Sequence, residues 1–463
     1  MKPLKRFAFL FVLLNLVIPV FGTTPASAYQ SGTETNTPIQ HFIVVMQQNH
    51  TFDNYFGTYP GANGIPKGVC IPPALSDQGT GQGTGACIKP FKITDHPMSD
   101  LAHSDTTFAG QFQNGKMNGF VDALNKINQD GTLSMGHFDD SDIPFYWNLA
   151  DQYVLFDNYF SSAHTGSIAN RMFWVAGQPG DTSNRIPKNG FNNIPTIFDS
   201  LQQRGISWKF YIKNYDPKLN YRSLADLDYL PPQVQWVPLL SMDRFLDDPN
   251  LSSHIVDLSE YYTDLEKGTL PAVSYVLLLG ASEHPLSNPA LGEQATRTMI
   301  YSLMQSSAWQ SSAFFITYDD WGGWYDHVPP PQVDDRGLGF RVPAMLVSPY
   351  ARTGHIDHTQ LEHTSILKFI EENWNVPPLA VRDDKANNFT SAFDFSMAPR
   401  PPVFISATRE VPQPRIEPRR IVIYAAYGAA MLFATLILAR ALTAREKIPH
   451  SSYATRHSEE IEP

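Results

Sequence analysis

Short apolar runs alternate with helix-like stretches along most of this 463-residue chain. Each run is apolar at nearly every position, which is typical of strands buried on both faces of a parallel sheet. The stretches between the runs repeat apolar residues three or four positions apart, as amphipathic helices do. This alternation predicts an α/β fold with a mainly parallel central sheet and helices on both faces. The expected strands are 42–46, 207–211, 274–279, 313–318 and 342–347, and the expected helices are 196–205, 292–309 and 364–374.

The two ends of the chain predict export and membrane attachment. Residues 1–28 combine basic residues, an apolar core and a final Ala-Ser-Ala, which is typical of a cleaved secretory signal peptide. An uncleaved anchor helix is the alternative interpretation of this segment. Residues 421–439 carry no charge and would span about 28 Å as a helix, close to the hydrocarbon thickness of a bilayer. We therefore expect a catalytic domain at 29–375 outside the cell, a Pro- and Arg-rich stalk at 376–420, and a cytoplasmic tail at 440–463.

The charge and the cysteine content restrict the environment of the protein. A net charge of −11 argues against a nucleic-acid partner, because nucleic-acid-binding proteins normally present a basic surface. Cys70 and Cys87 are the two cysteines of the chain, and they bracket a segment rich in Gly, Thr and Gln. In an oxidising compartment they are expected to form one disulfide, which would stabilise the fold by about 3 kcal/mol. Two free thiols are the alternative.

Polar side chains follow three of the expected strands at the points where those strands end. Gln48 and Asn49 follow strand 42–46, and Glu283 and His284 follow strand 274–279. Strand 313–318 continues into a loop with Asp319, Asp320, Asp326 and His327. The carboxyl ends of parallel strands meet at one edge of a sheet, where ligands of open α/β folds bind. The sequence therefore predicts a site rich in oxygen and imidazole groups at that edge.

Five segments of the chain resemble the phosphoesterase family that contains bacterial phospholipases C and certain acid phosphatases. That family is a branch of the alkaline phosphatase-like superfamily, so the resemblance implies an alkaline phosphatase-like fold. The matching segments occur in the expected order and cover most of 38–375. They are "QNHTFDNYFG" (48–57), "TIFDSLQQRGISWKFY" (196–211), "YDDWGGWYDHVPPP" (318–331), "FRVPAMLVSPYARTG" (340–354) and "EHTSILKFIEENW" (362–374).

The resemblance also implies roles for individual residues. It places the nucleophile on Ser167 in "AHTGSIANRMFWVAG" (163–177), with Thr165 as a nearby rival. It places phosphate-site histidines on His103 and His284. Two ligand pairs for one divalent metal cation fall on Gln48 with Asn49 and on Asp319 with Asp320, and further substrate-binding positions fall on Asn170, Arg171, His327 and His363.

These residues are chemically suited to the cleavage of phosphate esters. A divalent cation held by oxygen ligands would neutralise charge on the phosphoryl oxygens and lower the pKa of the Ser167 hydroxyl. The serine would then form a phospho-enzyme, and His284 would protonate the departing oxygen. The chain departs from the family pattern where Gln48 replaces Glu, His50 replaces Arg and Asp320 replaces Glu. The neutral Gln48 removes one negative charge from the metal shell, so either weaker metal binding or a changed preference among metals is expected.

Three functions follow from these observations. The first is a metal-dependent phosphoesterase of the phospholipase C or acid phosphatase type, acting on a phospholipid or a small phosphomonoester. The second is a sulfatase-like hydrolase of the same superfamily, since Ser167 lies four residues before Arg171, as the nucleophile does in the sulfatase signature. The third is a surface binding protein that keeps the fold but has impaired catalysis, for which Gln48 is the main argument.

Overall fold

The computed structural model describes residues 34–75, 83–94, 99–181, 184–409 and 417–445. The chain forms two compact units, residues 1–409 and 410–463, and each is considered by itself. The signal peptide expected at 1–28 lies outside the described residues, as does most of the tail expected at 440–463.

The first unit is built on a mixed sheet in which, among the described residues, eight strands pair in the order β13-β6-β12-β11-β1-β10-β8-β9. The strand β1 lies at the centre and pairs in parallel with both β10 and β11. The strand β12 runs antiparallel to its neighbours β11 and β6, and the other pairings are parallel. The strand bounds are β1 His41–Gln47, β6 Val154–Phe156, β8 Trp208–Ile212, β9 Ile255–Asp257, β10 Val273–Leu277, β11 Ser312–Tyr318, β12 Ala344–Val347 and β13 His355–Asp357.

The mainly parallel α/β fold predicted from the sequence is confirmed, and each of the five expected strands has its counterpart in β1, β8, β10, β11 or β12. These strands were recognisable because they are buried on both faces; every residue of β11 is buried, for example. The strands β6, β9 and β13 have only three residues each and were not predicted. Such short segments carry too little periodicity to be distinguished from a loop.

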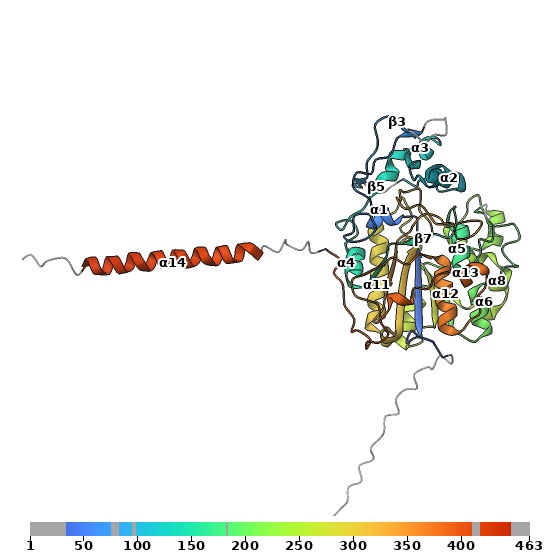
Figure 1. Ribbon diagram of the computed structural model, residues 1–463. Coiled ribbons are helices and arrows are strands. Elements are labelled where there is room, and N and C mark those ends of the chain that lie inside the picture. Colours follow the sequence, from blue (N-terminus) through green and yellow to red (C-terminus); the bar gives the residue numbers. More distant parts are fainter. Residues whose placement is uncertain (1–33, 76–82, 95–98, 182–183, 410–416, 446–463) are drawn as a thin grey trace, which may run out of the picture. The chain divides into compact units, whose positions relative to one another are not determined.

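Helices cover both faces of the sheet, with α4 and α11 on one side and α5, α6 and α12 on the other (Figure 1). The expected helices are present, and their ends follow ordinary capping chemistry. Thr196 and Asp199 form a capping box at the start of α6, and Asn375 ends α12 in the left-handed conformation. The helices of these two layers are α4 Pro144–Gln152, α5 Ser167–Ala176, α6 Ile197–Gln203, α10 Ser259–Lys267, α11 Pro289–Gln305 and α12 His363–Trp374.

A smaller group of elements lies over the carboxyl end of β1, and its members α2, α3, β3 and β5 are labelled at the top of Figure 1. It has its own apolar cluster, in which Phe108 and Phe120 contact Phe340. Cys70 and Cys87 form the predicted disulfide here, with Cα atoms 5.3 Å apart. The elements are α1 Phe52–Phe56, α2 Asp105–Phe112, α3 Phe120–Asn125, β2 Ala74–Leu75, β3 Gly83–Thr84, β4 Phe91–Lys92 and β5 Gly136–His137.

The remaining elements are short and lie in the connections. The short helices are α7 Pro232–Trp236, α8 Asp243–Asp247, α9 Pro249–Ser252 and α13 Val381–Lys385, and β7 Tyr159–Phe160 pairs with β14 Leu361–Glu362. Short 3₁₀ helices cover Gln113–Gly115, Gly131–Met135, Tyr221–Asp226, Pro238–Ser241, Ser307–Ser311 and Thr390–Ala392.

The segment expected to be a stalk, 376–420, packs on the first unit as far as Arg409. Phe389 and Phe393 are buried, and both rings stack on Phe369 of α12. These aromatic residues give a Pro- and Arg-rich segment an apolar side, and composition alone did not reveal it.

The second unit contains a single long helix among its described residues, α14 Glu417–Arg445. The section Tyr424–Leu442 is long and apolar enough to cross a membrane, judged by length and composition. It overlaps the segment 421–439 that the sequence predicted to be transmembrane.

Candidate active site

The loops after β1 and β11 bring the two predicted ligand pairs together. Gln47 and Tyr318 are paired residues at the ends of these neighbouring strands, so the residues that follow them leave the sheet side by side. The Gln48 amide nitrogen donates to Asp319 Oδ2 at 3.2 Å, and both side chains are fully buried. Asn49 turns the chain with a φ of 57°. A Cβ at Gly322 would lie 2.3 Å from the Asn49 carbonyl oxygen, so only glycine allows the two loops to pack this closely.

Ser167 is the first residue of α5, and its Oγ lies 3.4 Å from Asp320 Oδ2. The structure therefore places the predicted nucleophile next to the second ligand pair. Asn170, one turn later, accepts hydrogen bonds from the backbone N–H groups of Ser162 and Ala163 and donates to the Thr165 carbonyl. These bonds fix the turn before Ser167. Asn170 was expected to contact substrate, and the structure instead engages both ends of its amide with the backbone.

Arg171 supports the first aspartate of the pair from inside the protein. Its Nε donates to Asp319 Oδ2 at 2.9 Å, and the guanidinium also donates to the carbonyls of Met46 and Trp236 at 3.2 Å. The arginine and the aspartate are both fully buried. Removing one partner of such a pair leaves an uncompensated charge in the interior. Arg171 was also expected to bind substrate, and in the structure its donors are directed at protein groups.

His363 holds the backbone of the same aspartate. Its Nε2 lies 2.8 Å from the Asp319 carbonyl oxygen, and its Nδ1 lies 3.2 Å from the Tyr159 hydroxyl. Burial lowers the pKa of His363 to about 4, so the ring is neutral at physiological pH. A neutral ring can donate from Nε2 and accept at Nδ1, which matches these two partners. The structure thus gives His363 a contact with Asp319 rather than an open position for substrate.

His103 lies between the Asn49 side chain and the turn that precedes Ser167. Its Nε2 is 3.4 Å from Asn49 Nδ2, and a Cβ at Gly166 would lie 3.3 Å from His103 Cδ2. Burial favours the neutral ring, but the charges of Asp320, Asp100 and Asp319 and a hydrogen bond to the Leu101 carbonyl together outweigh it, and the pKa of His103 is raised above its ordinary value. Burial in turn raises the pKa of Asp320 to about 7. The His103 ring and the Asp320 carboxyl group thus influence each other electrostatically, and Asp320 lies beside Ser167.

Three consecutive residues each have a buried amide oxygen without a hydrogen-bond partner among the described residues, Gln47 Oε1, Gln48 Oε1 and Asn49 Oδ1, and the last two belong to the loop after β1. Buried polar atoms are normally paired, so these adjacent exceptions require a physical explanation. Carboxylate and amide oxygens are the ligands that hard divalent cations prefer. With Asp319 and Asp320, the Gln48 and Asn49 oxygens make a donor set that fits such a cation.

A second acidic cluster lies a few residues further along both loops. Asp53, Asp326 and His327 offer ligand atoms within 4.8 Å of one another and could in principle hold a metal ion. Arg341, however, donates to Asp326 Oδ1 at 2.9 Å and to Asp53 Oδ1 at 3.0 Å, and His327 Nδ1 lies 2.7 Å from Asp53 Oδ2. Asn63 Oδ1 is 3.2 Å from the other ring nitrogen of His327. His327, expected to bind substrate, thus belongs to an ion-pair network.

His284 stands in the wall of a cavity of about 510 Å³ beside the site. Its ring stacks on Trp236, and its Nε2 lies 3.9 Å from Asp100 Oδ2. The cavity is connected to the ligand loop because Ser282 in its wall accepts a hydrogen bond from the Gln48 backbone N–H at 2.8 Å. His284 is therefore connected to the loop that carries Gln48, and its ring packs on Trp236 of the cavity wall.

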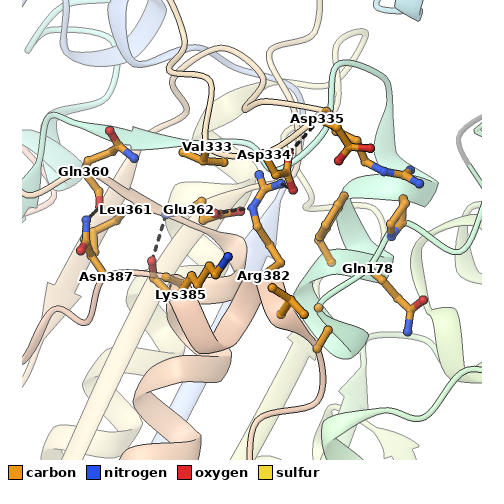
Figure 2. A pocket seen from close by; sticks show the side chains of 18 residues that line it. Gln178, Val333, Asp334, Asp335, Gln360, Leu361, Glu362, Arg382, Lys385 and Asn387 are labelled. Carbon is orange, nitrogen blue, oxygen red and sulfur yellow. Dashed lines mark hydrogen bonds and ion pairs between the residues drawn. The ribbon is translucent and has the colours of Figure 1, made fainter.

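Another pocket, of about 400 Å³, opens between the end of α5 and α13 and is shown in Figure 2. Arg382 forms ion pairs with Glu362 and Asp334 in its wall. Glu362 also accepts a hydrogen bond from Ser162 at 2.8 Å, and it directly precedes His363. The pocket wall is thus connected to the site through the Ser162–Glu362 hydrogen bond and through His363. Sequence reasoning missed this pair, because nothing in the sequence indicates that Glu362 and Arg382 meet.

Comparison with known proteins gives one family and several relatives. The model of the Phosphoesterase family matches residues 39–377. Phospholipase C A of Mycobacterium tuberculosis is 27% identical over 428 residues, which cover 78% of each chain. Non-specific phospholipase C1 of Arabidopsis thaliana is 27% identical over 400 residues, covering 78% of this chain and 72% of that protein. A solved structure from Vibrio parahaemolyticus in the alkaline phosphatase superfamily gives a TM-score of 0.36 at 12% identity, covering 73% of this chain and 68% of that chain.

Proposed function

Because the chain belongs to the Phosphoesterase family and is thus a hydrolase of phosphoester bonds, we propose that it cleaves phosphodiesters outside the cell through a Ser167 phospho-enzyme. Gln48, Asn49, Asp319 and Asp320 would hold one divalent cation. The observation that carries the proposal is the convergence of Ser167 Oγ on Asp320 beside two buried oxygens that have no protein partner among the described residues. That arrangement combines a nucleophile with an incomplete set of oxygen ligands.

The residues of the site divide the chemistry between them. In the first step, the Ser167 oxygen forms a bond to phosphorus while the bond from phosphorus to the departing alcohol oxygen breaks. The Ser167 proton passes to solvent, and His284 gives its proton to the departing oxygen. In the second step a water oxygen forms a bond to phosphorus while the bond from phosphorus to the Ser167 oxygen breaks; His284 takes a proton from that water, and the serine oxygen regains a proton from solvent. A bound divalent cation supplies charge neutralisation at the phosphoryl oxygens and favours the serine alkoxide. Arg171 and His363 keep Asp319 in place throughout.

The cavity beside His284 supports an apolar alcohol as the leaving group. Trp236 lines it, together with Tyr229 and Leu286, whose side chains are 62% and 65% exposed. Leu286 also has a φ of 80°, a conformation that leucine rarely adopts. Exposed apolar side chains around a cleft are typical of sites that receive apolar ligands. Together with the relatives named phospholipase C, this favours a phospholipid over a small phosphomonoester.

The proposed location combines both ends of the chain. Export through residues 1–28 and retention by α14 would leave the first unit outside the membrane. Protease treatment of intact cells should then degrade the first unit and spare an epitope placed after residue 445. Degradation of the epitope in intact cells would contradict this orientation.

The mechanism is tested with the purified full-length protein in detergent. We expect turnover of p-nitrophenyl phosphorylcholine, slower turnover of p-nitrophenyl phosphate, and no turnover of p-nitrophenyl sulfate. Ser167→Ala should lower kcat by about a thousandfold or more, because the nucleophile is lost. Thr165→Val is the matched control, since it removes the rival hydroxyl, and it should retain activity. Undiminished activity in Ser167→Ala would falsify the nucleophile assignment, and turnover of the sulfate alone would favour the sulfatase-like alternative.

A further inference from the structure

Glu283 is a buried acidic residue for which the proposed mechanism has no role. It lies in the loop after β10, is fully buried, and has a φ of 64°, which is unusual for a residue other than glycine. Its carboxylate accepts hydrogen bonds from the side chains of Gln47 and three tyrosines. Gln47 Nε2 donates to Oε1 at 3.0 Å, the Tyr146 hydroxyl donates to the same oxygen, and the hydroxyls of Tyr55 and Tyr318 donate to Oε2 at 2.7 and 2.6 Å.

The donors connect Glu283 to both ligand pairs. Gln47 is the last residue of β1 and directly precedes Gln48, and Tyr318 is the last residue of β11 and directly precedes Asp319. The Glu283 carbonyl also lies 3.0 Å from His50 Nε2, on the other side of Asn49. Glu283 therefore contacts the residue that precedes each ligand pair, and it also contacts His50, the residue that follows the first pair.

The neighbouring helix α11 makes room for this side chain. A Cβ at Gly292 would lie 2.2 Å from Glu283 Cγ and 2.4 Å from its Oε1. Glycine inside a helix lowers helix stability relative to alanine. Its presence at position 292 leaves the space of a Cβ free for the Glu283 side chain. A buried polar network of this kind is often no more stable than an apolar core of the same volume. Fold stability alone is thus a weak reason for a carboxylate at this position.

We propose that Glu283 is a positioning residue, which fixes the distance between the Gln48–Asn49 and Asp319–Asp320 pairs by holding the residues that precede them. The inference rests on the proposed function, because it assumes that these pairs bind a cation. Groups behind a metal site that orient its ligands commonly change metal affinity by tenfold or more when they are lost. Glu283 would act on the ligands indirectly, by holding Gln47 and Tyr318 at the ends of β1 and β11.

Two tyrosines provide a matched pair of variants. Tyr318→Phe and Tyr146→Phe each remove one hydroxyl that donates to the Glu283 carboxylate, and both side chains are fully buried. Only Tyr318 adjoins a ligand, since Tyr146 lies in α4. We expect Tyr318→Phe to weaken binding of the cation about tenfold and Tyr146→Phe to weaken it less than twofold, while both lower the Tm to a similar degree. Glu283→Gln should weaken binding at least as much as Tyr318→Phe.

Binding is measured by calorimetric titration of the full-length protein with Ca²⁺ and with Mn²⁺, each alone. The titration is made at pH 8, because burial raises the pKa of Glu283 to about 7 even though its four donors oppose that shift. Equal losses of cation affinity in the two tyrosine variants, or no loss in either, overturn the inference while leaving the cation site intact. A parent protein that binds neither cation overturns the proposed cation site itself.

Discussion

Two acidic clusters follow the same two strands, and the contrast between them shows how the proposed metal site differs from an ion-pair network. Each contains two buried aspartates and one buried arginine: Asp319 and Asp320 with Arg171, and Asp53 and Asp326 with Arg341. By residue type the second cluster is the better metal site, because it also contains His327.

The hydrogen bonds reverse that ranking. Arg341 donates to both carboxylates of the second cluster, and the Asn63 amide oxygen lies within hydrogen-bond distance of His327. In the first cluster, Arg171 pairs with only one aspartate, and two amide oxygens have no partner among the described residues. The proposal that a cation binds at the first cluster therefore rests on unmet acceptors rather than on the number of ligand-type residues.

The largest expected effect comes from replacing each arginine in turn. Arg341→Met should lower the free energy of unfolding by about 3–5 kcal/mol, because it leaves two buried carboxylates without their cation. Arg171→Met should cost a similar amount in the absence of metal. Added Ca²⁺ or Mn²⁺ should restore part of the stability of Arg171→Met only, since only that cluster is expected to bind a cation. Urea unfolding with and without the metal measures the loss of stability and its recovery in each variant. Equal recovery of the two variants would contradict the assignment of the cation site to the first cluster alone.

The next effect comes from Asp320, whose pKa burial raises to about 7 from an ordinary value near 3.9. A carboxyl group with a raised pKa in the folded state stabilises the protein less as pH rises from about 4 to about 7. Asp320→Asn removes this loss, so at pH 8 without metal it should raise the free energy of unfolding by up to about 4 kcal/mol, since a tenfold change in proton affinity corresponds to about 1.4 kcal/mol. The same variant should lose cation binding. Urea unfolding between pH 4 and pH 8 tests the sign, and a metal-free variant less stable than the parent at pH 8 would refute it.

The sequence was sufficient for the parts of the molecule that depend on local chemistry. The strands that carry the ligand loops are continuous apolar runs, and the position of Gln48 and Asp319 at one edge follows from strand direction. Ser167 was located through the motif that surrounds it, and the structure brings it to 3.4 Å from Asp320.

The sequence was insufficient where a role depends on a partner distant in the chain. Nothing near Arg341 indicates that it meets Asp53, which lies 288 residues away. Arg171 and His363 match the family motif, but the motif does not reveal that both contact Asp319. Motif position therefore identified the residues around the site. The hydrogen bonds of the structure were needed to show that Arg171 and His363 contact Asp319, which is proposed to bind the cation.

A smaller effect is expected from adding one negative charge to each cluster. Gln48→Glu should tighten cation binding about tenfold, because affinity rises with the number of charged ligands in an oxygen site. Asn63→Asp is the matched change in the second cluster, and it should leave cation affinity within about twofold. Calorimetric titration of both variants gives the comparison. Unchanged affinity in Gln48→Glu would exclude Gln48 from the metal shell.

The smallest effect concerns Arg222, which pairs with two aspartates as Arg341 does but is exposed to solvent. Arg222 pairs with Asp243 and Asp247, and the side chains of these three residues are 43–59% exposed. Water already solvates these charges, and salt screens them, so the pairs contribute little to stability. Arg222→Met should therefore change the Tm by no more than about 1 °C, with a difference that vanishes in 0.5 M NaCl.

Scanning calorimetry of Arg222→Met beside Arg341→Met isolates burial as the variable, because the chemical change is the same. A loss of stability in Arg222→Met comparable to that in Arg341→Met would mean that the number of paired carboxylates, and not their removal from water, governs the second cluster.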